Sequence, residues 1–131
     1  ILDGCNVGAE LFKRLASNVL VNVFDYFWPS HTYLASNEGD SERYLAYLDG
    51  FPGRRRGPFS IDEYEAASTA AECGDALRSV LVDAVVCAEA DRFIGNRCST
   101  MSDYILQLRS AAGRPLETGA VLGGARQTAV L

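Results

Sequence analysis

The chain has 131 residues, the length of one domain, and 48% of them are apolar, so a core of ordinary size can form. Its net charge of −5 is unfavourable for a broad nucleic-acid surface, because contacts to phosphates need clustered lysine and arginine. No run approaches the roughly 18 apolar residues that a membrane span needs. We therefore expect a single globular domain with no nucleic-acid partner and no transmembrane segment in this chain.

The first part of the chain predicts a helix, a strand and a second helix. Apolar residues recur every three or four positions over residues 9–28, which is typical of an amphipathic helix. Residues 32–36 indicate a short buried strand, and Asp40 or Ser41 can cap the helix that follows it. Residues 50–58 predict a loop, because they combine glycines, prolines and a run of three arginines that we interpret as a solvated turn.

The second part of the chain continues to alternate strand and helix. Residues 59–61 predict a short strand, and residues 62–65 begin a weak, alanine-rich helical stretch. Residues 75–90 predict a helix that is apolar almost all round and must pack on more than one side. Residues 92–94 indicate a buried strand, and residues 99–112 a helix that ends at a glycine. Residues 119–131 are small, polar and rich in glycine, so we expect them to be loosely ordered.

This alternation predicts an α/β fold with a parallel sheet and right-handed crossovers. We expect residues 1–115 to form a partial Rossmann-like domain and residues 116–131 a glycine-rich C-terminal tail. Ligands of such sheets bind beyond the carboxyl ends of the strands. Residues 35–38 and residues 95–100 fall at such ends, so they are the places to look for a site.

The junction between the last predicted strand and the last helix is the strongest candidate. Gly95 and Asn96 supply the turn. Ser99 or Thr100 can cap the helix, and Asp103 completes a capping-box pattern after Thr100. The free N–H groups at a helix start and the positive end of its dipole attract anions. The sequence therefore predicts a phosphate site here, while capping alone would explain the same hydroxyls.

Asp83 is the only carboxylate within the apolar run of residues 80–88. Burying an ionised carboxylate without partners costs several kcal/mol. Its partner is therefore either local, such as an arginine or a backbone amide, or a ligand.

Other classes of site find little support. The four cysteines contain no Cys-x-x-Cys pair, and His31 is the only histidine, so we expect no metal. Cys87 is interpreted as a small core residue, and the disulfide state stays open. No Ser/His/Asp set can be assembled, so no catalytic residue is assigned.

Two stretches resemble the GDP-fucose protein O-fucosyltransferases and their relatives. Residues 90–102, Ala-Asp-Arg-Phe-Ile-Gly-Asn-Arg-Cys-Ser-Thr-Met-Ser, together with Asp83 sixteen residues before Ser99, resemble the superfamily's C-terminal motif. Residues 33–38, Tyr-Leu-Ala-Ser-Asn-Glu, resemble its middle motif. The resemblance implies the C-terminal half of a GT-B glycosyltransferase, with a Rossmann-like parallel sheet and flanking helices. The implied activity is transfer of fucose from GDP-fucose to a hydroxyl of a protein or glycan acceptor.

The resemblance also implies the residues that contact the guanosine. Asp83 matches the aspartate that accepts hydrogen bonds from the guanine N1–H and exocyclic amine. Adenine presents an acceptor at that edge, so an aspartate would select against it. Asn37 stands where relatives often carry an aspartate, so a role near the ribose or base passes to Asn37 or Glu38.

On the phosphate side, Ser99, Thr100 and Met101 match the Ser-Ser/Thr-Phe segment whose hydroxyls and backbone amides hold the β-phosphate. Met101 replaces the usual phenylalanine, which keeps a backbone contact but softens any aromatic packing. Arg97 could add a cationic contact, although a solvent-facing arginine is the simpler interpretation.

One motif of the superfamily is missing. Its fucosyltransferases carry a His-x-Arg sequence whose arginine stabilises charge on the departing GDP, and no His-x-Arg occurs here. We therefore expect a fragment that is inactive alone, since transfer needs that stabilisation. Relatives need no metal or cofactor beyond the donor substrate. The alternative is a non-catalytic nucleotide-binding or interaction domain on the same scaffold. The compartment is the secretory pathway if the source is eukaryotic and the cytoplasm if it is bacterial.

Overall fold

The computed structural model describes residues 31–36, 42, 46, 49, 51, 53–97, 99–122 and 128–130. In this part of the chain, helices accompany two small sheets, one with two strands and one with three. The fold is therefore mixed α/β with parallel strands. The chain divides into two compact units, Pro29–Cys87 and Ile1–Trp28 together with Ala88–Leu131. We call them the β1–β2 unit and the β3–β5 unit after their strands.

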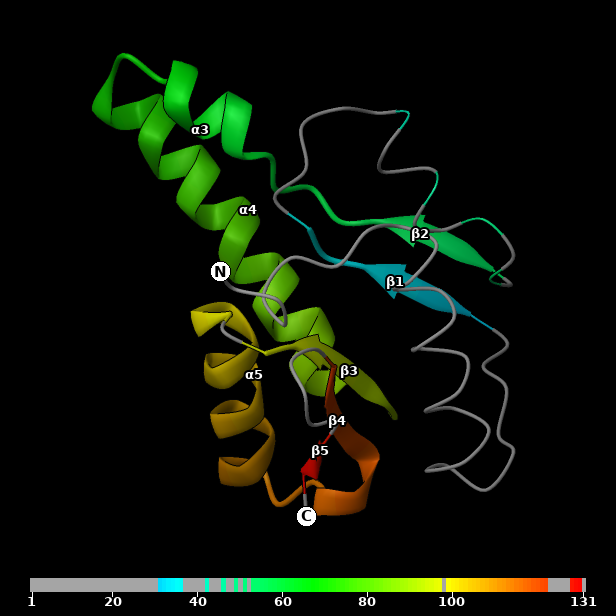
Figure 1. Cartoon of the computed structure of the whole chain (residues 1–131). Helices are drawn as coiled ribbons and strands as arrows, with labels where there is room; N and C mark the ends of the chain where they lie inside the picture. The colour runs from blue at the N-terminus through cyan, green and yellow to red at the C-terminus, as the bar shows by residue number, and fades with distance from the viewer. Residues whose placement is uncertain are drawn as a thin grey trace, which may run out of the picture. The chain divides into compact units, whose positions relative to one another are not determined.

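The β1–β2 unit is built on a parallel pair of short strands, β1 (Thr32–Leu34) and β2 (Arg54–Arg56). Figure 1 shows the two strands side by side. A backbone hydrogen bond of 2.9 Å from the Gly57 N–H to the Leu34 carbonyl continues the pairing past β2. The strand predicted over residues 32–36 is thus confirmed in its first three residues, which are half-buried and not buried as predicted.

Strand β2 and the helix after it correct two predictions. The loop expected over residues 50–58 contains a strand, because pairing uses only backbone groups and leaves the charged arginine side chains exposed. The strand expected over residues 59–61 is wrong, since helix α3 (Ile61–Ala66) begins there. Ser60 precedes it with an extended backbone, and two acidic residues in the first turn favour a helix start.

Helix α4 (Ala70–Glu89) begins earlier than the predicted residue 75 because a capping box starts it. The Glu72 N–H donates to Thr69 Oγ1 at 3.2 Å. In return, Glu72 Oε2 accepts from the N–H groups of Ser68 and Thr69, each at 3.0 Å. Hydrogen bonds to the Glu72 carboxylate from the amides and hydroxyls of Ser68 and Thr69, led by that of the Ser68 amide, lower the pKa of Glu72.

Only one side of α4 is buried. Asp83, Ala84, Cys87 and Ala88 lie inside, which confirms Cys87 as a core residue. The prediction that α4 packs on more than one side is wrong for the opposite face, where large apolar side chains are 43 to 56% exposed. These residues are Leu77, Leu81, Val82 and Val85.

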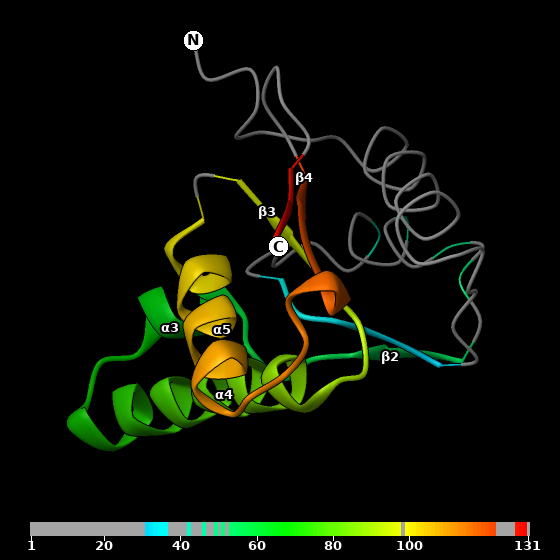
Figure 2. The same ribbon diagram turned by 90° about the horizontal axis from the view of Figure 1, so that it is seen from below.

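The β3–β5 unit holds β3 (Phe93–Asn96), α5 (Thr100–Ala111), a 3-10 turn (Leu116–Thr118), β4 (Gly119–Leu122) and β5 (Thr128–Val130). β4 is the central strand, parallel to β3 and antiparallel to β5. Figure 2 shows β3 leading through a turn into α5. The predicted strand near residues 92–94 and the predicted helix after it are confirmed.

Strand β4 overturns the prediction of a loosely ordered segment from residue 119. Ala120 and Leu122 are each only 1% exposed, so they belong to the core of this unit. The small side chains of Gly119 and Ala120 permit close packing of a central strand. The composition of the segment resembled that of a loop, because it does not show the strand that pairs with it.

Several predictions lie outside the described residues, namely the helix over residues 9–28 and the roles of Asn37 and Glu38. Of the cysteines, Cys73 and Cys87 are described, and neither is part of a disulfide bond. No helix in the described ranges is long and apolar enough to cross a membrane.

Candidate functional site

The junction between β3 and α5 lies at the carboxyl edge of a parallel strand pair. β3 ends at Asn96 opposite Leu122, the last residue of β4, and the Arg97 N–H donates to the Leu122 carbonyl at 2.7 Å. Ser99 follows with an extended backbone, and its Oγ accepts from the Ser102 N–H at 3.2 Å. Ser99 is therefore the N-cap, as predicted.

Thr100 has a different place from the one its capping-box pattern predicted. It is the first residue of α5, so it does not cap the helix, and the pattern of Thr100 with Asp103 is not used for capping. Instead the Asp103 N–H donates to the Ser99 carbonyl at 3.1 Å. Thr100 is exposed, which leaves its hydroxyl available to a ligand.

Ser102 fixes the end of β3 against the start of α5. Its Oγ accepts from the Asn96 N–H at 3.0 Å, and the residue is only 7% exposed. It lies so close to Gly95 that a Cβ there would meet Ser102 Oγ at 2.8 Å and Phe93 Cε1 at 2.9 Å. Glycine at residue 95 thus allows the contact. Sequence reasoning missed Ser102, and its spacing three residues after the cap was the available signal.

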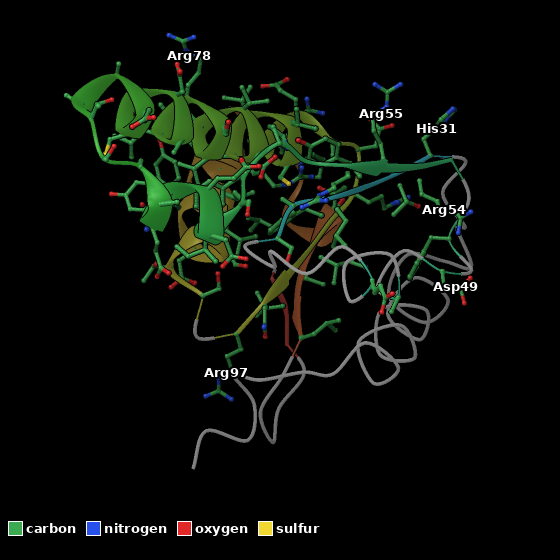
Figure 3. The ribbon with its side chains drawn as sticks, turned by 90° about the horizontal axis from the view of Figure 1, so that it is seen from above. His31, Asp49, Arg54, Arg55, Arg78 and Arg97 are labelled. Atoms are coloured by element: carbon green, nitrogen blue, oxygen red, sulfur yellow. The ribbon has the colours of Figure 1, made fainter. Side chains whose placement is uncertain are left out.

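The first turn of α5 presents hydrogen-bond donors. The amide N–H groups of Thr100 and Met101 have no acceptor within their own helix, because they belong to its first turn. Together with the positive end of the helix dipole they favour an anion. Arg97 is exposed, and in Figure 3 its side chain extends away from α5. The prediction of a solvent-facing Arg97 is therefore confirmed.

Asn96 adds a polar group that sequence reasoning used only as a turn residue. Its Oδ1 is buried and has no hydrogen-bond donor among the residues that the structure describes. A buried acceptor without a partner costs about 1–3 kcal/mol. A hydroxyl or N–H of a ligand at this edge could supply the missing donor.

Asp83 lies in the β1–β2 unit and has local partners. The Tyr33 hydroxyl donates to Asp83 Oδ1 at 2.6 Å, and the Phe59 backbone N–H also donates to the carboxylate. Burial raises the pKa of Asp83, and the hydrogen bonds from Tyr33 and Phe59 oppose that rise. The residue is 3% exposed and is covered by Gly57, where an added Cβ would overlap the carboxylate. The local partner that the sequence allowed is thus present, and the guanine contact stays a prediction.

The predicted site residues fall into separate groups. Ser99, Thr100 and Met101 are consecutive at the α5 junction in the β3–β5 unit, whereas Asp83 belongs to the β1–β2 unit. His31 is exposed just before β1. Among the described residues, no group of three histidine, cysteine or acidic side chains is placed to hold a metal ion.

Comparison with protein-family models, with curated proteins and with solved structures finds no match to this chain. Function is therefore inferred from the chain's own residues and from the resemblance of its motifs.

Proposed function

We propose that this chain belongs to a GDP-fucose-dependent fucosyltransferase and has the Rossmann-like fold of the C-terminal half of a GT-B enzyme. The observation that carries the proposal is the β3–Ser99–α5 junction at the carboxyl edge of the parallel pair β3–β4. Open α/β sheets bind ligands at this edge. The motif resemblance of residues 90–102 adds the residue types that hold a diphosphate.

The phosphate side of the proposed site uses α5. The Thr100 and Met101 amides donate to the β-phosphate, and the exposed Thr100 hydroxyl adds a donor. Ser99 Oγ accepts from Ser102, so its own hydrogen remains available for a phosphate oxygen. Capping and phosphate binding are therefore compatible at Ser99.

The guanine contact that the resemblance implies falls on Asp83. A carboxylate has about four acceptor positions, and the Tyr33 hydroxyl and the Phe59 amide occupy two of them. The guanine N1–H and amine are two donors that match the remaining positions. Because Asp83 is only 3% exposed, guanine binding requires the segment around Gly57 to shift away from the carboxylate.

Calorimetry with GDP, ADP and guanosine tests the two sides separately. Asp83→Asn turns an acceptor into a donor and should weaken GDP by about 1–3 kcal/mol without weakening ADP. The matched control is Asp75→Asn, which alters an exposed carboxylate on the same helix. Equal affinity of the unmodified chain for GDP and ADP would remove the guanine assignment.

Thr100→Ala tests the phosphate side. It should weaken GDP but leave guanosine unchanged, because only GDP carries the diphosphate. Ser110→Ala removes an exposed hydroxyl near the other end of α5 and is the control. Equal losses for GDP and guanosine would show that Thr100 does not contact phosphate.

A further inference from the structure

Helix α4 carries a row of apolar side chains on the face opposite its buried side. Leu81, Val82 and Val85 are 53, 43 and 56% exposed, whereas Asp83 and Cys87 are buried. Large apolar side chains that adjoin one another on a surface mark a place where a partner binds. The charges beside this row indicate which partner fits it.

Two of the apolar side chains lie in a line with two charges of opposite sign. The line consists of Arg78, Val82, Val85 and Glu89, which are separated by four, three and four residues. This alternation is the one with which a helix packs lengthwise against a second helix. The line begins with a cation and ends with an anion, roughly 16 Å apart along the helix axis.

The order of these charges decides the direction of a second α4. In a parallel pair, Arg78 would face Arg78 and Glu89 would face Glu89, so both ends would repel. In an antiparallel pair, Arg78 of each copy faces Glu89 of the other. The same register places Val82 opposite Val85, because the two pairs of positions have the same midpoint on the helix. Charge and apolar contact therefore favour one and the same arrangement.

The contacts that Arg78 and Glu89 make within the chain leave them able to bind a second copy. Arg78 Nη1 lies 3.7 Å from Asp75 Oδ1, with side chains that are 79% and 77% exposed, and such exposed pairs hold the side chains only weakly. In Figure 3 the Arg78 side chain extends outward from α4. Glu89 Oε2 accepts from Arg114 at 2.9 Å, and a carboxylate has further acceptor positions.

We propose that two copies of this chain associate through α4, with the helices antiparallel and the two-fold axis passing between Val82 and Val85. The same patch then serves both copies, as a two-fold interface requires. The patch offers few apolar side chains per copy, so the dimer is a weak and reversible one. It uses no residue of the proposed nucleotide site and goes beyond the proposed fucosyltransferase function.

Sedimentation equilibrium of the full chain from roughly 10 μM to 1 mM, where weak dimers dissociate, tests the proposal. The fraction of dimer should rise with concentration. Val82→Arg places a charge at the centre of the contact and should weaken the dimer at least about tenfold. The matched control is Gln107→Arg, which adds the same charge at an exposed position of α5 and should change nothing.

Charge reversal tests the antiparallel direction. Arg78→Glu and Glu89→Arg should each weaken the dimer about tenfold, because like charges then meet at both ends. The double variant restores unlike pairs and should associate as the unmodified chain does. The proposal is overturned if the chain stays monomeric throughout, if the double variant associates no better than the single ones, or if Gln107→Arg weakens the dimer as much as Val82→Arg. A monomer that loses stability on Val82→Arg would also overturn it, since the face would then be covered within its own chain.

Discussion

Arg109 is expected to be the most important single side chain for the stability of the β3–β5 unit. It is 3% exposed. Its guanidinium donates to the carbonyls of Ala88 at 3.1 Å, Ala90 at 2.6 Å and Asp91 at 3.3 Å, and to Thr118 Oγ1 at 2.8 Å. A cation is thus placed at the C-terminal end of α4, where helix carbonyls lack intrahelical partners.

Arg109→Met keeps most of the buried stem but removes every donor. Four acceptors each lose a hydrogen bond, and at about 1 kcal/mol apiece the loss is about 4 kcal/mol. Arg109→Lys should lose about half of that, because a single ammonium group cannot reach acceptors spread over both α4 and the 3-10 turn.

Urea unfolding followed by circular dichroism measures these losses. Arg114→Met is the matched control, because Arg114 also contacts the end of α4, through Glu89 at 2.9 Å, but with side chains that are 30% and 65% exposed. It should lose no more than about 1 kcal/mol. A loss below about 1 kcal/mol for Arg109→Met, or an equal loss for Arg114→Met, would refute this reasoning.

Three further predictions concern stability. In the same urea assay, Gly57→Ala should destabilise the fold by about 1–3 kcal/mol, because its Cβ would overlap the Asp83 carboxylate. Gly74→Ala has open space around it on α4 and should stabilise the fold by about 0.5–1 kcal/mol. Burial raises the pKa of Asp83, so the contribution of Asp83 to stability is complete below the unfolded pKa and is lost as pH rises through the folded pKa. The stability of Asp83→Asn relative to the unmodified chain should therefore increase from about pH 4 upward. A difference in stability that stays constant with pH would contradict the raised pKa. Ser99→Ala should cost about 0.5–2 kcal/mol as the loss of an N-cap, and Thr100→Ala less than about 0.5 kcal/mol; the opposite order in thermal unfolding would mean that Thr100 is the cap.

Local signals were sufficient to predict the segment from β3 to α5. Ser99 has the residue type of an N-cap and performs that role. Gly113 follows α5 with a φ of 74°, a conformation that glycine adopts without strain. Signals of this kind depend on residues a few positions apart, so they can be read without the rest of the fold.

Strands β2 and β4 could not be predicted in the same way. An arginine triplet and a segment that begins with glycine and alanine resemble loops in composition. Each becomes a strand because a distant segment pairs with its backbone, β1 with β2 and β3 with β4. Tertiary pairing therefore overrides local preference.

Part of the site was equally hidden. Ser102, Ile105 and Arg109 are the buried residues of α5, at helical spacing on one face. The spacing alone would place Arg109 inside, but its charge suggests the surface, and only the carbonyls at the end of α4 explain its burial. Asn96 resembled an ordinary turn residue, and the unpaired Oδ1 is visible only in the structure.

The most direct test of the central claim is an NMR titration of the isotope-labelled chain with GDP and, separately, with guanosine. The proposed function predicts that GDP produces saturable shifts of the Thr100 and Met101 amides, because these first-turn donors hold the β-phosphate. Guanosine, which lacks phosphates, should leave both signals in place. Saturable GDP binding that leaves both amides unchanged, or the absence of GDP binding, would contradict a phosphate site at the start of α5.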